Sequence, residues 1–306
     1  AAGGAGPVAG VIDALRAIES GQANNVLCVA GDVYSVAKHY QLMGNFNHSL
    51  YNYAAPYGFG GPNGLFAIIQ RKYMETYGIT REQLGKISVA QRENARLNEN
   101  AVLREQLTLD DYLSARMIAD PLRLYDCVLP CAGADAIVLG PVDRLPKEKR
   151  VKVTAGFEQH NWPPGEVCPL RGGWEVFRDR LYDTAGRGPD EMHFLQAYDD
   201  YPIMVAIQIE DLGFCPKGEV GEFIDNHDLT WAGDFPLDTG GGQLSIGQAG
   251  AGGGLMGVVE AARQIRREAG PRQIVHCDQG VVAGYGMVGY GHGLSASAIV
   301  VEREGA

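Results

Sequence analysis

The feature that most constrains the fold is a repeated order of elements, in which a helix with one apolar face precedes a short apolar strand. Apolar residues between 7 and 21 recur at helical spacing, and residues 25–31 form an apolar run that ends in glycine. A second such run spans 134–140, and a helical pattern at 255–269 precedes strand patterns at 274–282 and 294–302. Continuous apolar strands are typical of a sheet covered by helices. We therefore predict an α/β fold with helices packed on mostly buried strands.

The remaining patterns divide the chain into two halves. Helices are predicted at 65–77, at 80–95 after Thr80, at 109–119 with Asp110 as its cap, and at 190–212. A charged connector at 141–149 is the best boundary, so we expect one half at 1–145 and the other at 146–306. The first half carries a loop excursion at about 32–120, and the first part of this segment shows neither helical nor strand periodicity. Long irregular segments are often functional.

Charge and composition exclude several classes of protein. The 306 residues carry a formal net charge of −11, which argues against a nucleic-acid partner or an anionic membrane surface. No apolar run reaches the length of a membrane span and no signal peptide is visible, so we expect a cytoplasmic protein. Neither the histidines nor the isolated C-x-x-x-C of Cys127 and Cys131 shows the spacing of a metal site. We expect no metal and predict that these thiols are buried.

Six segments, taken in order, resemble one known family. They are 4–32; 73–98, with Y-M-E-T-Y-G-I-T and R-E-N-A-R-L-N; 120–139, with D-P-L-R-L-Y-D-C and G-A-D-A-I-V-L; 198–223, with Y-D-D-Y and I-E-D-L-G-F-C-P-K-G-E; 239–264, with G-G-G-Q-L-S-I-G-Q-A-G-A-G-G-G; and G-Y-G-M-V-G-Y-G-H-G near the end. Together they resemble the thiolase superfamily, and within it the sterol-carrier-protein-type thiolases and the lipid-transfer-like, steroid side-chain aldolases. The resemblance implies a thiolase-like fold of two fused α/β/α halves in a five-layer αβαβα arrangement. It also implies at least a homodimer and a first half that lacks its first strands.

The groups that carry thiolase chemistry are replaced in this chain. The position that matches the nucleophilic cysteine, at the N-terminus of a helix, falls at Gly4, or at Gly3 if the register shifts by one residue, and glycine cannot form a thioester. The position that matches the activating histidine falls at Gln248, whose amide can form hydrogen bonds but cannot shuttle a proton near neutral pH. The glycine-rich loop around it would present N–H groups to a phosphate or a carbonyl. We predict that the substrate or its coenzyme A part contacts Ser245, Gly247, Gly250 and Gly4.

Phenols stand at the two remaining positions. Tyr198 begins the Y-D-D-Y that matches the motif supporting the thiolase oxyanion hole, and Tyr290 and His292 lie where the second thiolase cysteine is expected. A phenol can polarise a thioester oxygen or act as an acid or base. The alternatives are a tyrosine that starts a helix and a tight turn with surface aromatics.

This set of groups suits enolate chemistry without a covalent intermediate. The resemblance implies retro-aldol cleavage of a β-hydroxyacyl-CoA with a bulky, steroid-like or aromatic acyl group. Tyr198 and Tyr290 would be acid, base or oxyanion donors, supported by His292 and Gln248. No covalently bound cofactor is expected, and coenzyme A enters as part of the substrate. Two alternatives stay open: an acyltransferase whose cysteine is supplied elsewhere, and a non-catalytic acyl-CoA or lipid-binding subunit. The resemblance also implies a possible small partner protein with an OB-fold and a zinc ribbon.

Overall fold

The computed structural model describes residues 2–33, 52–53, 55–58, 61–289 and 293–305. Two predicted site residues, Tyr290 and His292, lie outside the described residues. Within the described part of the chain, no helix is both long and apolar enough to cross a bilayer. The same residues contain no cluster of three or more side chains that could hold a metal ion.

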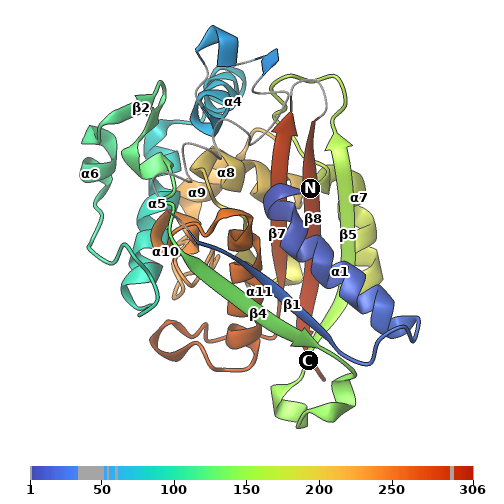
Figure 1. Ribbon diagram of the computed structural model, residues 1–306. Helices are drawn as coiled ribbons and strands as arrows, with labels where there is room; N and C mark the ends of the chain where they lie inside the picture. Colours follow the sequence, from blue (N-terminus) through green and yellow to red (C-terminus); the bar gives the residue numbers. More distant parts are fainter. Residues whose placement is uncertain (1, 34–51, 54, 59–60, 290–292, 306) are drawn as a thin grey trace.

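The larger sheet has four strands in the order β5-β8-β7-β6 (Figure 1). β5 (Val151–Trp162) and β7 (Gln279–Gly289) both pair antiparallel with β8 (Gly293–Arg303), and the short β6 (Leu195–Gln196) runs parallel to β7. Helix α1 (Gly6–Glu19) packs on the face that carries Ile299 and Val301. Helix α7 (Trp174–Ala185) packs on the opposite face, with Val300. The sheet is therefore covered on both faces, as its apolar strands require.

The smaller sheet is an antiparallel ribbon of β1 (Val26–Asp32) and β4 (Gly133–Leu139). One face of this ribbon packs on α1 and α11 (Gly253–Ile265), and Figure 1 shows the ribbon crossing in front of α11. On the other face Leu27, Val29 and Val138 are each more than 60% exposed. The prediction that these two strands are buried was therefore correct for one face only. The half-buried Cys28 lies on the covered face.

The excursion folds into helices α4 (Pro62–Tyr77), α5 (Arg81–Arg96) and α6 (Leu109–Ser114) and a small hairpin of β2 (Met117–Ala119) and β3 (Leu122–Arg123). Thr80 caps α5 as predicted, because its hydroxyl accepts a hydrogen bond from the N–H of Gln83. The predicted helix at 109–119 was too long and its cap was wrong. Thr108 forms a capping box with Asp111, and the chain after Ser114 leaves the helix to build the hairpin.

The second half differs more from the sequence pattern. The helix predicted at 190–212 was wrong in its first part, because β6 precedes α8 (Pro202–Asp211). The predicted strand at 274–282 starts only at Gln279. Helices α7, α9 (Val220–Asn226) and the short α10 (Gly242–Ile246) were not predicted. The single-turn 3₁₀ helices are Gly3–Ala5, Ala55–Tyr57, Leu124–Asp126, Val142–Arg144, Lys147–Lys149, Pro189–Glu191, Gly250–Gly252 and Gly270–Arg272.

The connector at 141–149 contains two of these turns, and β5 begins directly after it. Division of the chain at this point remains a prediction. Cys127 and Cys131 are half-buried, so the prediction that these thiols are buried was only partly correct.

Candidate active site

Tyr198 lies on the short segment between β6 and α8, where a strand of the larger sheet ends. The Gln208 side chain fixes its backbone: Gln208 Oε1 accepts from the Tyr198 N–H at 3.0 Å, and Nε2 donates to the Tyr198 carbonyl at 2.8 Å. The phenol ring is almost fully buried and stands edge-on to the ring of Tyr285, with the centroids 5.0 Å apart. Packing and hydrogen bonds together hold this phenol in one orientation.

Gly4 lies directly under the Tyr198 ring, in the 3₁₀ turn that leads into α1. A Cβ atom built on Gly4 would lie 2.1 Å from Tyr198 Cε2 and Cζ and 2.6 Å from the phenol oxygen. Such distances are far below van der Waals contact, so any side chain at residue 4 would displace the ring. The phenol therefore occupies the space that a side chain at the N-terminus of α1 would need.

Gln248 reaches the same point from the glycine-rich loop, because its Nε2 donates to the Tyr198 phenol oxygen at 3.3 Å. The Gln248 backbone is held on both sides: its N–H donates to Leu129 O, and its carbonyl accepts from the N–H of Cys131, each at 2.9 Å. Gly247 has a φ of 104°, and a Cβ there would lie 2.8 Å from Cys131 Sγ. Only glycine fits this position without strain.

Three predicted site residues that are far apart in sequence, Gly4, Tyr198 and Gln248, thus meet in space. Ser245 is buried in α10, where its hydroxyl accepts a hydrogen bond from Arg92 Nε at 3.0 Å. Gly250 has a φ of 54° and lies close to the Asp32 carboxylate. The binding and catalytic roles of all these residues, and of Tyr290 and His292, stay predictions.

Sequence reasoning missed a second phenol and the carboxylate that it contacts. Tyr285, on β7, is buried and donates a hydrogen bond to Asp200 Oδ1. Burial and the adjacent charge of Asp199 raise the pKa of the Asp200 carboxyl well above its usual value. The available signal was the Y-D-D-Y segment itself, because two consecutive acids after an apolar strand are costly to bury without a purpose.

The phenol of Tyr198 is a donor rather than a base at neutral pH. Burial, and then the charge of Asp200, raises its pKa above the ordinary value for tyrosine, while the hydrogen bond from Gln248 acts in the opposite direction. A protonated phenol beside an amide N–H suits the stabilisation of a developing oxyanion.

Asp199 connects this site to helix α10. Its buried carboxylate accepts hydrogen bonds from the N–H groups of Gln243 at 2.7 Å and Leu244 at 3.1 Å, in the first turn of that helix. Burial raises the pKa of Asp199 to about 7, while these two hydrogen bonds lower it. The carboxyl group therefore titrates near neutral pH.

The Asp199→Asn substitution should change how stability depends on pH. The pKa rises from 3.8 to about 7 on folding, so the folded protein binds an additional proton between these values. The stability that protonated Asp199 contributes is fully present below about pH 4 and is lost as the pH rises through about 7. When urea unfolding is measured between about pH 4 and pH 7, the free energy of unfolding of the native protein should fall relative to that of the variant as the pH rises. The slope should be at most about 1.4 kcal/mol per pH unit, and a difference that is constant or rises with pH would contradict the assignment.

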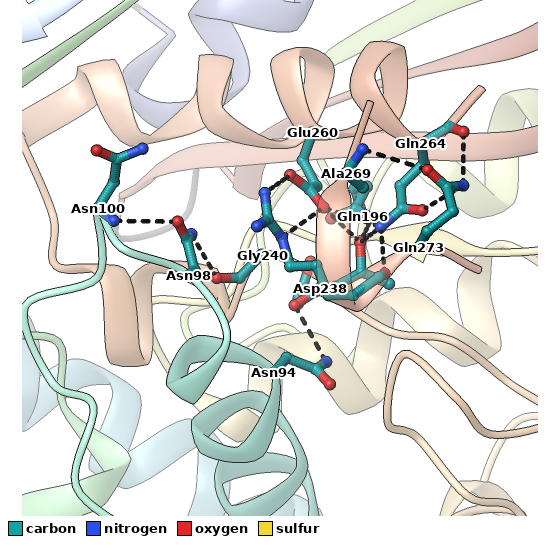
Figure 2. Close-up of polar contacts among 12 residues, drawn as sticks. Asn94, Asn98, Asn100, Gln196, Asp238, Gly240, Glu260, Gln264, Ala269 and Gln273 are labelled. Atoms are coloured by element: carbon teal, nitrogen blue, oxygen red, sulfur yellow. Dashed lines mark hydrogen bonds and ion pairs between the residues drawn. The ribbon is translucent and has the colours of Figure 1, made fainter. Parts of the chain in front are cut away.

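A buried polar network fixes the segment that precedes α10 (Figure 2). Thr239 Oγ1 donates to Glu260 Oε1 at 3.0 Å. Glu260 also forms a bidentate ion pair with Arg272, in which Nε donates to Oε1 at 3.1 Å and Nη2 donates to Oε2 at 2.8 Å. From the excursion, Asn98 Nδ2 donates to the Gly240 carbonyl at 2.8 Å. All of these residues, Gly240 included, are less than 10% exposed. The network thereby holds α10, and with it Asp199 and Gln248, in a fixed position relative to the larger sheet.

The fold and this arrangement are those of a thiolase-like protein, with the Tyr198 phenol and the Gln248 amide meeting beside Gly4. A family model described as thiolase C-terminal domain-like matches residues 176–301. The solved structure of the Ltp2-ChsH2(DUF35) aldolase is similar, with a TM-score of 0.82, 25% identity, and coverage of 99% of this chain and 79% of that one. Human mitochondrial 3-ketoacyl-CoA thiolase has the same fold, with a TM-score of 0.63 at 12% identity, covering 99% of this chain and 77% of that one. These similarities confirm the predicted fold class.

Curated relatives identify the family. The steroid side-chain-cleaving aldolase of Thermomonospora curvata is 30% identical over 86% of this chain and 71% of its own length. The 17-hydroxy-3-oxo-4-pregnene-20-carboxyl-CoA lyase of Mycobacterium tuberculosis is 32% identical over 70% of this chain and 58% of its own. The acetyl-CoA acetyltransferase of Methanothermobacter thermautotrophicus is 30% identical over 74% of this chain. The chain belongs to the thiolase superfamily, in its sterol-carrier-protein-like branch, and spans about 60% of the length of the last two relatives.

Proposed function

We propose that this protein cleaves a β-hydroxyacyl-CoA by a retro-aldol reaction. The observation that carries the proposal is the phenol of Tyr198 in the space where a side chain at residue 4 would lie. The N-terminus of α1 therefore faces a hydrogen-bond donor instead of a thiolate. The names of the relatives, a steroid side-chain-cleaving aldolase and a pregnene-carboxyl-CoA lyase, support a bulky, steroid-like acyl group.

The reaction needs one base and one oxyanion site. The base removes the proton of the β-hydroxyl group, the Cα–Cβ bond breaks, and its electron pair moves into the thioester as an enolate. The released ketone or aldehyde leaves, and protonation of Cα yields the shortened acyl-CoA. Tyr198 and Gln248 would donate hydrogen bonds to the thioester oxygen, where negative charge develops.

We assign the base to Asp200, acting with Tyr285. The raised pKa of this carboxyl makes its ionised form a stronger base than an ordinary aspartate. The Tyr285 phenol donates to Asp200, and its ring stands edge-on to the ring of Tyr198. Tyr290 and His292 stay predicted participants. Coenzyme A enters only as part of the substrate, and the reaction as written balances without any cofactor.

The raised pKa values of the cysteine thiols argue against acyl transfer through a cysteine. Burial raises the pKa of all six thiols, and for Cys127, Cys215 and Cys277 it raises the pKa to about 12. A nucleophilic cysteine needs a lowered pKa. The acyltransferase therefore remains the second candidate, supported by the acetyltransferase relative.

The activity can be tested on two β-hydroxyacyl-CoA substrates, one with a steroid-like ring system and one with a straight chain. We expect a shortened acyl-CoA and a carbonyl product in equal amounts, faster from the ring-bearing substrate, as followed by mass spectrometry. Intact-protein mass spectrometry should find no acyl adduct. An acyl group on any cysteine, or exchange of acyl groups with free coenzyme A, would favour the acyltransferase instead.

We also propose that the protein forms a homodimer and binds a small OB-fold and zinc-ribbon protein. The name of the Ltp2-ChsH2(DUF35) aldolase structure, which pairs two components, supports a protein partner. Light scattering on the protein alone, and after co-expression with such a partner, tests both statements. A cytoplasmic location remains a prediction.

A further inference from the structure

Gln243 carries a buried amide that forms no hydrogen bond in the part of the chain that the structure describes. The residue lies in the first turn of α10 and is only 1% exposed. Neither its Nε2 nor its Oε1 has a partner among the described residues. A buried polar group without a partner destabilises a folded protein, so an amide kept in this state calls for an explanation in function.

The position of this amide is fixed by the backbone around it. The Gln243 N–H donates to Asp199 Oδ1 at 2.7 Å, and the Gln243 carbonyl accepts from the N–H of Gly247 at 3.0 Å. The amide oxygen faces Gly253, where an added Cβ would lie 2.0 Å from Oε1 and 2.7 Å from Cδ. Any side chain at residue 253 would therefore displace the amide, and the glycine leaves room for it.

Two ionisable groups lie beside the amide, the phenol of Tyr198 and the carboxyl group of Asp199. Burial raises the pKa of both, and the Gln243 side chain lies close enough to act in the opposite direction, although neither contact reaches hydrogen-bond geometry. Each carboxylate oxygen already accepts a backbone N–H from the start of α10. Among the described residues, the phenol oxygen accepts a single donor, the Gln248 amide at 3.3 Å. The phenol is therefore the group with room for a further donor.

A donor at the phenol oxygen becomes more effective as the reaction proceeds. When Tyr198 donates to the thioester oxygen, its proton shifts toward the substrate, and negative charge grows on the phenol oxygen. Hydrogen bonds to a charged acceptor are shorter and stronger than those to a neutral one. Catalytic hydrogen bonds are often long without substrate and tighten in the transition state. An unpaired amide beside this phenol is suited to form such a bond.

We propose that Gln243 is a positioning residue that acts through Tyr198, donating from its amide to the phenol oxygen as negative charge develops there. Together with Gln248, it makes the phenol a stronger hydrogen-bond donor toward the substrate. The expected effect on turnover rests on the proposed retro-aldol function, whereas the expected effect on the phenol itself does not.

Titration of the phenol at residue 198 tests this role without any turnover. Replacement of Tyr198 by trifluorotyrosine introduces a far more acidic phenol, and its fluorine resonances report its charge. Gln243→Met keeps a long side chain but removes the amide. It should raise the measured pKa of this phenol by about one pH unit, which corresponds to the loss of one hydrogen bond to a charged group. Gln243→Leu provides the same measurement if the methionine variant does not fold.

The matched control is Gln70→Met. Gln70 is another fully buried glutamine whose amide has no hydrogen-bond partner among the described residues, but it lies on α4, within the apolar core. This variant should leave the pKa of the phenol at residue 198 unchanged. An unchanged or lowered pKa in Gln243→Met, or an equal rise in Gln70→Met, would overturn the proposal.

The kinetic test uses the ring-bearing β-hydroxyacyl-CoA. Gln243→Met should lower kcat about three- to tenfold with little change in KM, because one pH unit in the acidity of a donor alters the rate by at most about tenfold. In a Tyr198→Phe background it should have no further effect, since the phenol oxygen is absent. A loss of equal size in both backgrounds would place Gln243 on the substrate itself and overturn the proposal. If the native protein cleaves no β-hydroxyacyl-CoA, the proposed function fails, and the titration still decides the role of Gln243.

Discussion

Replacement of Tyr198 by phenylalanine is expected to lower kcat for retro-aldol cleavage by about 10²- to 10³-fold, the usual cost of losing one oxyanion donor. Phenylalanine keeps the ring that fills the space above Gly4 and packs edge-on against Tyr285. It removes only the hydroxyl that meets Gln248 Nε2. The loss should therefore appear in kcat, measured with the ring-bearing substrate, and hardly at all in KM.

Tyr182→Phe is the matched control. Tyr182 is an equally buried phenol whose hydroxyl donates to the Leu212 carbonyl at 2.9 Å, and it takes no part in the candidate site. This variant should lose a little stability and keep its turnover. If Tyr198→Phe turned over substrate at the native rate, Tyr198 would not be the oxyanion donor, and the non-catalytic binding subunit would become the better hypothesis. Equal losses in the two variants would indicate a general effect of buried hydroxyl groups.

The second large effect is expected from Gly4→Ala, which should destabilise the protein by about 3 kcal/mol or more, at the upper end of overpacking costs. The added methyl group would lie 2.1 Å from two carbon atoms of the Tyr198 ring. The ring cannot move aside freely, because it is buried against Tyr285 and its backbone is held by Gln208. Urea unfolding measures the change, and turnover should fall with it.

Gly10→Ala provides the control for Gly4→Ala. Gly10 lies on α1, the helix that follows the 3₁₀ turn of Gly4, and a Cβ there meets no heavy atom within 4 Å. Alanine at this position should stabilise α1 by about 0.5–1 kcal/mol, as alanine does in helices generally. A double-mutant cycle then isolates the contact, since in a Tyr198→Ala background the cost of Gly4→Ala should fall by more than half. Additive effects of the two substitutions would show that the ring and residue 4 do not compete for space.

The elements with strong local patterns were predictable. Helix α1, helix α5 with its Thr80 cap, and strand β8 lie close to where periodicity and capping placed them. Residues 190–212 failed because their apolar content is compatible with either a helix or a strand. Leu195 pairs with Val281 in parallel, across 86 residues of sequence, and that contact overrides the local preference for a helix.

The sequence by itself determined which residues stand at the positions that the resemblance matches to the catalytic groups: Gly4 at the predicted nucleophile position, Gln248 at the predicted histidine position, and a phenol at Tyr198. These conclusions depend on residue identity in an ordered pattern, which needs no coordinates. Only the tertiary structure decided that the phenol occupies the space above Gly4 and that Tyr285 donates to Asp200. Each of these depends on distances between distant segments and on desolvation, and both are set by how the helices pack on the two sheets.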